Sequence, residues 1–251
     1  MLTKRIIAAL DIQNLKVVKG IKFQDIKEVG DPIELSKRYE KDGIDEIVFL
    51  DISASLENRN PLFKLIEKIS ENLNIPFTVG GGINSLKDII TIINKGADKV
   101  FINTAAVLNP DLIKKSVKIL GSANICIAID SKKENNGEDY VYIKGGSKKT
   151  DIKTLEWIKY IQNIGAGEVI ITSMDHDGVQ TGYGCELIKK INEVSTIPVI
   201  ASGGAGKIKH FYDVFESGAD GALAASIFHY EKIPIYQLKK SLKEMDVNVR
   251  I

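Results

Sequence analysis

Two aspartates end similar apolar stretches in the two halves of the sequence. Asp11 closes the stretch 5–11 in the context Ala-Leu-Asp, and Asp130 closes 124–130 in the context Ala-Ile-Asp, 119 residues later. Two carboxylates that flank one substrate form a natural acid/base pair, because their surroundings can hold one protonated and the other ionised. We therefore expect Asp11 and Asp130 to be catalytic, with the assignment of acid and base left open. The alternative is that each aspartate only caps the loop after a strand.

Glycine-rich turns also occur twice. Gly80-Gly81-Gly82 and Ser202-Gly203-Gly204 each follow an apolar stretch, and the next stretch along the chain ends in Asn103-Thr104 in one half and Ala225-Ser226 in the other. Glycines let backbone N–H groups approach an anion without a Cβ in the way, and a helix beginning at Ser226 would add its dipole. The duplication predicts two phosphate sites and a substrate with a phosphate at each end. Two tight strand–helix connections are the alternative.

Charged residues stand at the opposite, N-terminal ends of the expected strands. Arg5, Glu46, Lys99 and Glu168 occupy such positions, and Glu46 and Glu168 match in the two halves of the sequence. If these side chains point inward, two cations and two anions meet at one end of the fold. We expect a paired charge plug that closes this end. The alternative is a gate on a channel through the fold.

The elements that must position these residues alternate between short β-branched runs and amphipathic stretches. Such alternation predicts an α/β fold with strand–helix units, and in a (β/α)8 barrel the functional residues lie at the C-terminal ends of the strands. An open doubly wound sheet is the structural alternative. Strands are expected near 5–11, 46–51, 76–80, 98–103, 124–130, 168–173, 198–202 and 220–225, and helices near 32–42, 59–72, 85–95, 110–120, 153–164, 185–194, 207–217 and 234–244.

An internal repeat favours the barrel. The segment 75–82 resembles 197–204, and Gly96-Ala97-Asp98 returns 122 residues later as Gly218-Ala219-Asp220. Each half holds four strand–helix units, and two such halves close a barrel. We therefore expect one domain over 1–251, a single (β/α)8 TIM barrel built from two homologous half-barrels, about 1–120 and 121–251. The polar stretch 131–150 is expected to form an exposed loop or hairpin.

The composition excludes several classes of protein. The 251 residues include 34 Lys and Arg against 33 Asp and Glu, which leaves no electrostatic footprint for nucleic acid or an anionic membrane. No apolar run is long enough to span a membrane, and the N-terminus does not resemble a signal peptide. Cys126 and Cys185 make no disulfide framework, so a reducing cytoplasm is expected. The histidines lack metal-ligand spacing with each other or with cysteine, so no metal is expected. No cofactor is expected either.

Taken together, these residues resemble the cyclase subunit family of imidazole glycerol phosphate synthase, the HisF family of histidine biosynthesis. The likeness covers essentially the whole chain, and its motifs are more specific than any single glycine-rich turn. The most specific stretches are 4–8, 17–20, 49–52, 78–83, 102–106, 172–175, 177–178, 201–206 and 247–250.

The resemblance implies an enzyme that acts on a bisphosphorylated ribulosyl-aminoimidazole carboxamide ribonucleotide. Ammonia adds to the open-chain arm, and cleavage and cyclisation give imidazole glycerol phosphate and the carboxamide ribotide. The family's two catalytic aspartates match Asp11 and Asp130. Its substrate- and phosphate-binding positions match Lys19, Asp51, Gly82, Asn103, Thr104, Asp177, Gly178, Ser202, Gly203, Gly204, Ala225 and Ser226.

The resemblance also implies a partner. In the family a glutaminase subunit (HisH type) makes ammonia from glutamine, forms a heterodimer with the barrel, and delivers the ammonia from the floor to the mouth. The charged set Arg5, Glu46, Lys99 and Glu168 matches the family's ammonia gate, and Asp98 matches a position at the partner interface. These matches favour the gate over a plain charge plug.

Two loops depart from the family pattern. The first loop usually reads Lys-Asp-Gly-Arg and here reads Gln-Asn-Leu-Lys, so that Leu15 replaces a glycine. In the sixth loop, Arg, Thr and Lys of the usual pattern are replaced by His176, Val179 and Gln180. The second set of changes falls on one of the two expected phosphate sites.

Three rival functions remain open. One is an ammonia-channelling paralogue that serves the amidination of surface sugars, and Asp11, which such relatives tend to lose, argues against it. A second is the sister isomerase of the same pathway, which needs no charged gate. A third is a non-catalytic barrel that only holds or regulates a glutaminase, and the presence of both Asp11 and Asp130 argues against it.

Overall fold

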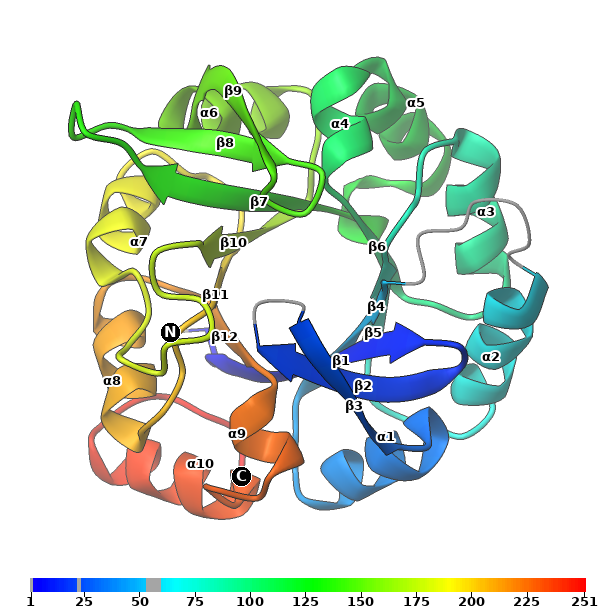
Figure 1. Ribbon diagram of the computed structural model, residues 1–251, viewed down its shortest axis with the longest axis vertical. Helices are drawn as coiled ribbons and strands as arrows, with labels where there is room; N and C mark the ends of the chain where they lie inside the picture. The colour runs from blue at the N-terminus through cyan, green and yellow to red at the C-terminus, as the bar shows by residue number, and fades with distance from the viewer. Residues whose placement is uncertain (1, 22–23, 53–59) are drawn as a thin grey trace.

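Eight parallel strands close into a barrel in the computed structural model, which describes residues 2–21, 24–52 and 60–251. Neighbouring strands pair in sequence order around the barrel, β1 also pairs with β12, and β7 pairs with β10, so the sheet has no open edge within this ring (Figure 1). The predicted (β/α)8 barrel is thereby confirmed against an open sheet. The barrel strands are β1 (Arg5–Gln13), β4 (Glu46–Asp51), β5 (Phe77–Gly80), β6 (Lys99–Ile102), β7 (Ile125–Lys133), β10 (Glu168–Ser173), β11 (Val199–Ser202) and β12 (Gly221–Ala224).

Helices surround the barrel on the outside (Figure 1). Their starts follow local signals: the Asp31 side chain accepts from the Ile33 and Glu34 N–H groups at 2.9 and 3.2 Å, and Pro32 is the first helical residue, as predicted. The large helices, all close to their expected positions, are α1 (Pro32–Lys41), α2 (Asn60–Ser70), α3 (Leu86–Asn94), α5 (Asp111–Leu120), α6 (Thr154–Asn163), α7 (Cys185–Asn192), α8 (Ile208–Glu216) and α10 (Ile235–Glu244).

The internal repeat extends to individual hydrogen bonds. Asp98, just before β6, accepts from the Phe77 N–H at 2.9 Å, and Asp220, just before β12, accepts from the Val199 N–H at 3.0 Å. Both donors and both acceptors are 122 residues apart in the sequence. Each aspartate therefore ties the start of its strand to the start of the preceding one at equivalent places in the two halves.

Additional short elements lie at the end of the barrel where the strands finish. The polar stretch after β7 forms a hairpin of β8 (Asp139–Ile143) and β9 (Lys148–Lys153), which confirms the expected loop or hairpin. A second hairpin of β2 (Lys16–Ile21) and β3 (Gln24–Gly30) continues β1, and it was not predicted (Figure 1). The short helices α4 (Thr104–Leu108) and α9 (Ser226–His229) follow strands at this end as well, whereas the 3-10 turn η1 (Ser122–Asn124) lies just before β7, at the opposite end of the barrel.

The apolar core has two parts. The larger part lies between the strands and the surrounding helices, and the smaller part fills the inside of the barrel. Cys126 belongs to the inner part and is fully buried, as its parity with Asp130 predicted. The other buried members of the inner part are Ile7, Val48, Phe101, Ala128, Ile170, Ile200 and Leu223. Across the described ranges, every helix is too short or too polar to cross a membrane.

Candidate active site

A cavity of about 830 Å³ opens at the C-terminal ends of the barrel strands. Asp11 reaches it from β1 and Asp130 from β7, and these two strands lie on opposite sides of the ring. Apolar side chains of the inner core, among them Val48, Phe101 and Leu223, form its base. The cavity thus places two carboxylates over an apolar surface, the setting in which a buried acid and base operate on a bound substrate.

The Asp130 carboxyl group titrates near neutrality. Burial raises its pKa from the usual 3.8 to about 6, the Asn103 side chain opposes the shift by donating from Nδ2 to Oδ2 at 2.9 Å, and the nearby charge of Asp177 adds to it. A carboxyl group with such a pKa can both accept and release a proton at neutral pH. This property suits general acid/base chemistry.

The first glycine-rich turn, after β5, lines one side of the cavity together with Asp51, Asn103 and Thr104. Gly81 has φ +97°, and a Cβ there would lie 2.0 Å from the backbone oxygen of Asp51, so only glycine fits. The Thr104 hydroxyl accepts from the Lys144 N–H at 2.8 Å, which ties α4 to the β8–β9 turn. The buried Asn103 Oδ1 has no hydrogen-bond partner among the described residues and is available to a ligand donor.

The second glycine-rich turn, after β11, lines the other side of the cavity. Gly204 has φ +106°, and a Cβ there would lie 2.0 Å from the Gly182 oxygen, which again requires glycine. Ser226 stands at the start of α9, which has only four residues. The remaining residues expected here also line the cavity: Asp177, Gly178, Ser202, Gly203 and Ala225. Gly82 and the side chains of Asn103 and Thr104 lie with the first turn. The residues expected at the two phosphate sites therefore occupy separate sides of the cavity.

One expected residue cannot be placed, and several residues that were not expected line the cavity. Lys19 belongs to β2, but its side chain lies outside the described part of the chain. Gly145 and Gly146 of the β8–β9 turn reach the cavity, although the sequence reasoning treated this stretch only as exposed. The Gly-Gly pair, which resembles the two glycine-rich turns, was the sequence pattern that could have indicated their position at the cavity. Gln180 of the sixth loop also lines the cavity and had been noted only as a departure from the family pattern.

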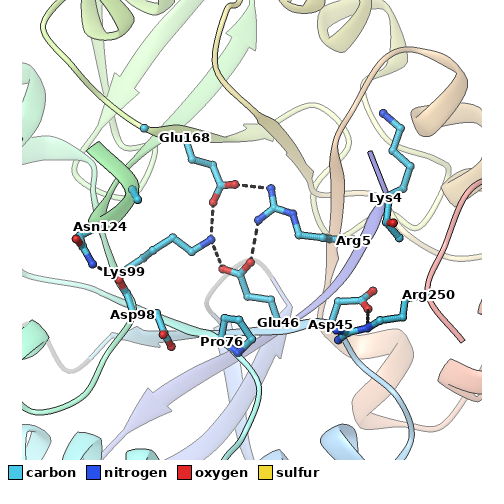
Figure 2. Close-up of a pocket in the computed structure, with 13 residues that line it drawn as sticks. Lys4, Arg5, Asp45, Glu46, Pro76, Asp98, Lys99, Asn124, Glu168 and Arg250 are labelled. Carbon is cyan, nitrogen blue, oxygen red and sulfur yellow. Dashed lines mark hydrogen bonds and ion pairs between the residues drawn. The ribbon is translucent and has the colours of Figure 1, made fainter. Parts of the chain in front are cut away.

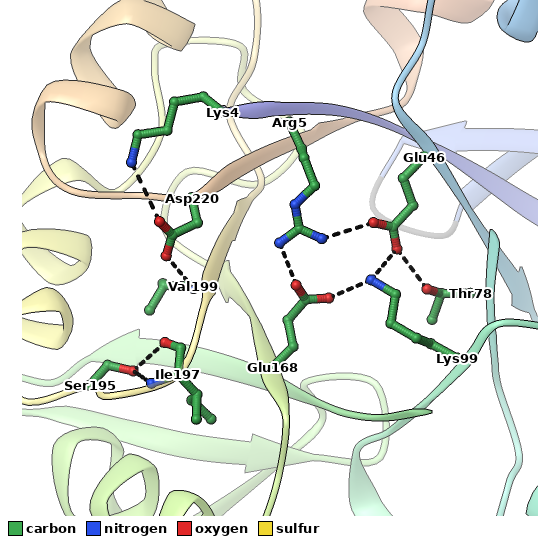
Figure 3. Close-up of polar contacts among 10 residues, drawn as sticks. All are labelled: Lys4, Arg5, Glu46, Thr78, Lys99, Glu168, Ser195, Ile197, Val199 and Asp220. Carbon is green, nitrogen blue, oxygen red and sulfur yellow. Dashed lines mark hydrogen bonds and ion pairs between the residues drawn. The ribbon is translucent and has the colours of Figure 1, made fainter. Parts of the chain in front are cut away.

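At the opposite end of the barrel, four charged side chains form a closed ring (Figures 2 and 3). Lys99 Nζ lies 2.7 Å from Glu46 Oε1 and 2.8 Å from Glu168 Oε2, while Arg5 lies 2.9 Å from Glu46 Oε2 and also donates to Glu168. The Thr78 hydroxyl donates to Glu46 at 2.8 Å. The structure therefore brings together all four residues that the sequence placed at the strand starts.

The ring stabilises its own charges. Burial alone would raise the pKa of Glu168, but the positive charges of Lys99 and Arg5 outweigh it and hold that pKa below its ordinary value. Burial would likewise lower the pKa of Lys99, and the two glutamates outweigh it and raise that pKa. Glu168 and Lys99 are thus each held in the charged form at neutral pH.

A second cavity of about 810 Å³ lies outside the ring, at the N-terminal ends of the strands (Figure 2). Asp98 lines it together with Asn124, whose side-chain amide donates to the Asp98 backbone oxygen at 2.6 Å. Asp45 and Arg250 lie on its other side, 3.4 Å apart. No cluster of three or more His, Cys, Asp or Glu residues that could hold a metal occurs within residues 2–21, 24–52 and 60–251.

Comparison with known proteins gives one consistent result. The profile of the family described as "Histidine biosynthesis protein" matches residues 5–234. A protein of Petrotoga mobilis is 58% identical over 100% of both chains, one of Thermococcus onnurineus is 57% identical over 100% of this chain and 99% of its own, and one of Pyrococcus furiosus is 53% identical over 100% of both. Each of the three is named imidazole glycerol phosphate synthase subunit HisF.

Proposed function

We propose that the cavity at the C-terminal ends of the barrel strands, called the mouth cavity below, is the site of the cyclase reaction of histidine biosynthesis. The reason is that the chain belongs to the family of imidazole glycerol phosphate synthase subunit HisF. The substrate is the bisphosphorylated ribulosyl-aminoimidazole carboxamide ribonucleotide, and the second reactant is ammonia. The products are imidazole glycerol phosphate and the aminoimidazole carboxamide ribotide. The enzyme is thus a lyase that also closes a ring.

The observation that carries the proposal is the pair of carboxylates in one cavity, flanked by glycine-rich turns on two sides. The ammonia nitrogen must lose protons as it forms bonds to carbon, and the departing ribotide must gain one. Asp11 and Asp130 supply these transfers jointly, and the pKa of Asp130, raised to about 6 by burial, lets it exchange a proton near neutral pH. Because the reaction makes and breaks bonds between carbon and nitrogen with proton transfers and needs no external oxidant or reductant, the proposal requires no cofactor.

The two glycine-rich sides are proposed to hold the two phosphates of the substrate. The backbone around Gly82 with Asn103 and Thr104 would bind one, and the backbone of Gly178, Gly204 and Ala225 with the Ser226 hydroxyl would bind the other. Binding both ends of an extended substrate holds its reacting centre between the two aspartates. The binding energy of the phosphates thereby offsets the entropic cost of orienting the reacting atoms. Lys19 joins this set on the strength of the family resemblance.

The charged ring is proposed to gate ammonia that arrives from the floor. A glutaminase subunit (HisH type) would dock there as the partner in a heterodimer, with Asp98 at the contact. Between ring and cavity lies the apolar interior around Ile7, Cys126 and Ile200. Such an interior admits neutral ammonia more readily than ammonium, because an unpaired charge is costly to bury. We place the reaction in the cytoplasm, where Cys126 and Cys185, which form no disulfide, remain reduced.

The test is turnover without a partner. The purified chain is supplied with the bisphosphate substrate and excess ammonium at mildly alkaline pH, and formation of imidazole glycerol phosphate is followed beside Asp11→Asn and Asp130→Asn. Turnover in the parent and its collapse in both variants is the expected result. Substrate binding without turnover in the parent would instead favour the amidination paralogue.

A further inference from the structure

The described lining of the mouth cavity carries acidic but no basic side chains. Among the cavity-lining residues in the part of the chain that the structure describes, four are aspartates and none is a lysine or arginine. Each phosphate monoester adds a charge of about −1.5 to −2 at neutral pH. A cation at the edge of the second phosphate site would therefore favour binding of the phosphate there.

Gln180 connects that site to a cation. Its side-chain Nε2 donates to the Ser226 hydroxyl oxygen at 3.2 Å, and its Oε1 accepts from Lys232 Nζ at 3.1 Å. A lysine ammonium group can only donate, so the contact with Lys232 fixes which end of the amide is the oxygen. The amide N–H groups of Gln180 consequently point toward Ser226 and the cavity.

The backbone at Gln180 is built to hold this position. Its φ is +56°, a conformation in which a side chain costs about 1 kcal/mol or more and glycine costs little. Gly206 packs so closely against this backbone that a Cβ on Gly206 would lie 2.4 Å from the backbone carbonyl oxygen of Gln180. The chain thus carries a glutamine side chain where glycine would be easier, as is typical of residues with a role at a site.

The backbone of Lys232 is also held in place, just after α9. Its N–H donates to the Ile227 oxygen at 3.0 Å, which secures the segment after α9. The neighbouring Glu231 is paired with Arg38 at 2.8 Å, so its carboxylate is compensated elsewhere. Lys232 is exposed, and its contact with Gln180 places its ammonium group at the edge of the second phosphate site.

We propose that Lys232 and Gln180 form an anion-selecting relay for the second phosphate site. Lys232 polarises Gln180, and Gln180 donates to the Ser226 oxygen. The Ser226 hydroxyl proton is then free to point away from Gln180 and donate to a phosphate oxygen. Hydrogen bonds in such a chain strengthen one another, and those that end on a charged group are the strong ones. This inference rests on the proposed function and assigns it two further binding residues.

The test measures ground-state binding at one end of the substrate. Lys232→Gln and Gln180→Met are assayed with saturating ammonium, and each singly phosphorylated product, imidazole glycerol phosphate or the carboxamide ribotide, is titrated as an inhibitor. Each variant should raise KM for the bisphosphate about tenfold with kcat within about twofold, the scale of one charge-assisted contact. The inhibition constant should weaken for only one of the two products, because only one occupies this site.

Control variants distinguish the loss of the relay from the general effect of removing a positive charge from the surface. Lys159→Gln removes an exposed lysine of α6 with the same change of charge and should leave all constants unchanged. Lys232→Arg should restore binding, and the double variant should be no worse than the stronger single one, because both residues act in one chain. An unchanged KM in Lys232→Gln, or equal weakening of both products, would overturn the relay while parental turnover still supports the cyclase. A parent without turnover would overturn both.

Discussion

The buried carboxyl group of Asp130 destabilises the folded chain when it is ionised, although its proposed role depends on that burial. Its pKa of about 6 in the folded chain exceeds its usual 3.8, so the folded state binds the proton more tightly, and the free energy of unfolding falls as pH rises through this window. Asp130→Asn removes the charge and keeps an acceptor for Asn103. The variant should be more stable than the parent by about 1–3 kcal/mol above pH 7, since one pKa unit corresponds to about 1.4 kcal/mol.

Urea unfolding at pH 8 and pH 4 checks this expectation. The stability difference should nearly vanish at pH 4, where the parental carboxyl group is already protonated, while the variant stays inactive at either pH. A difference of equal size at both pH values would show that packing, rather than the buried charge, separates the two proteins.

The positions of single residues were predictable where the two halves of the sequence repeat, while their catalytic and binding roles stay predictions. Asp11, Asp130 and both glycine-rich turns were placed at the mouth because each has a counterpart in the other half. Gln180 and Gly145-Gly146 have no such counterpart, and they reach the cavity through the course of long connections. Side-chain contacts such as that of Lys232 with Gln180 depend on that course, which no local pattern in the sequence encodes.

At the scale of elements, the β1–β2 hairpin contains a strained turn. Gln13 pairs with Lys16, and the two residues between them, Asn14 and Leu15, have φ of +51° and +61°. This two-residue geometry favours Asn-Gly, so Asn14 suits its position and Leu15 does not. Leu15→Gly should stabilise the hairpin by about 1 kcal/mol, the cost of a side chain in this conformation.

Hydrogen exchange of the β2 amides measures this gain directly, because a hairpin can open without global unfolding. Leu15→Ala is the matched control: it shortens the side chain but keeps the Cβ, and its exchange rates should match those of the parent. Equal protection in both variants would contradict the backbone explanation and point to the partly exposed leucine side chain.

The strand and helix pattern was predictable because each barrel unit carries local signals, such as Asp31-Pro32 before α1. The strands β2 and β3 were not predicted, because the turn between β1 and β2 has Leu15 where glycine would have marked it. The short helix α4 was also missed, whereas α9 begins at Ser226, where the sequence analysis considered a helix start. Four or five residues are too few to show a helical period.

The charged ring joins four strands, and removing one member should affect them all. Glu168→Gln leaves Arg5 and Lys99 to share Glu46, so we expect a loss of about 2–4 kcal/mol at pH 7, as for other broken buried pairs. Because the folded pKa of Glu168 lies below its ordinary value of 4.5, its contribution is present above that value and is lost as pH falls through the folded pKa.

Denaturant unfolding from pH 7 down to pH 3 follows this contribution. The difference in the free energy of unfolding between the parent and Glu168→Gln should become smaller as the solution becomes acidic. Glu186→Gln, at an exposed glutamate 3.4 Å from Lys133, is the control and should cost less than about 0.5 kcal/mol. A comparable loss in both variants would mean that the ring contributes no more than a surface pair.

For the molecule as a whole, the closed barrel followed from the repeat, and the repeat recurs in paired contacts such as those of Asp98 and Asp220. The division into half-barrels at about residue 120 within one domain stays a prediction. The charged ring is less symmetric than the fold: Glu46 and Glu168 match across the halves, whereas the position that matches Lys99 is Gly221. A repeat therefore predicts the scaffold better than it predicts the chemistry placed on it.

The matched pair Asp98 and Asp220 can separate folding from partner binding. Each accepts from a strand N–H, and asparagine keeps that acceptor, but only Asp98 lines the floor cavity. Asp98→Asn should therefore lower glutamine-driven turnover with the glutaminase about tenfold at subsaturating partner, the scale for one interfacial charge, and leave ammonium-driven turnover unchanged. Asp220→Asn should keep both activities. If both variants lose glutamine-driven turnover equally, the effect belongs to the strand starts in general, and Asp98 would have no special place at the partner interface.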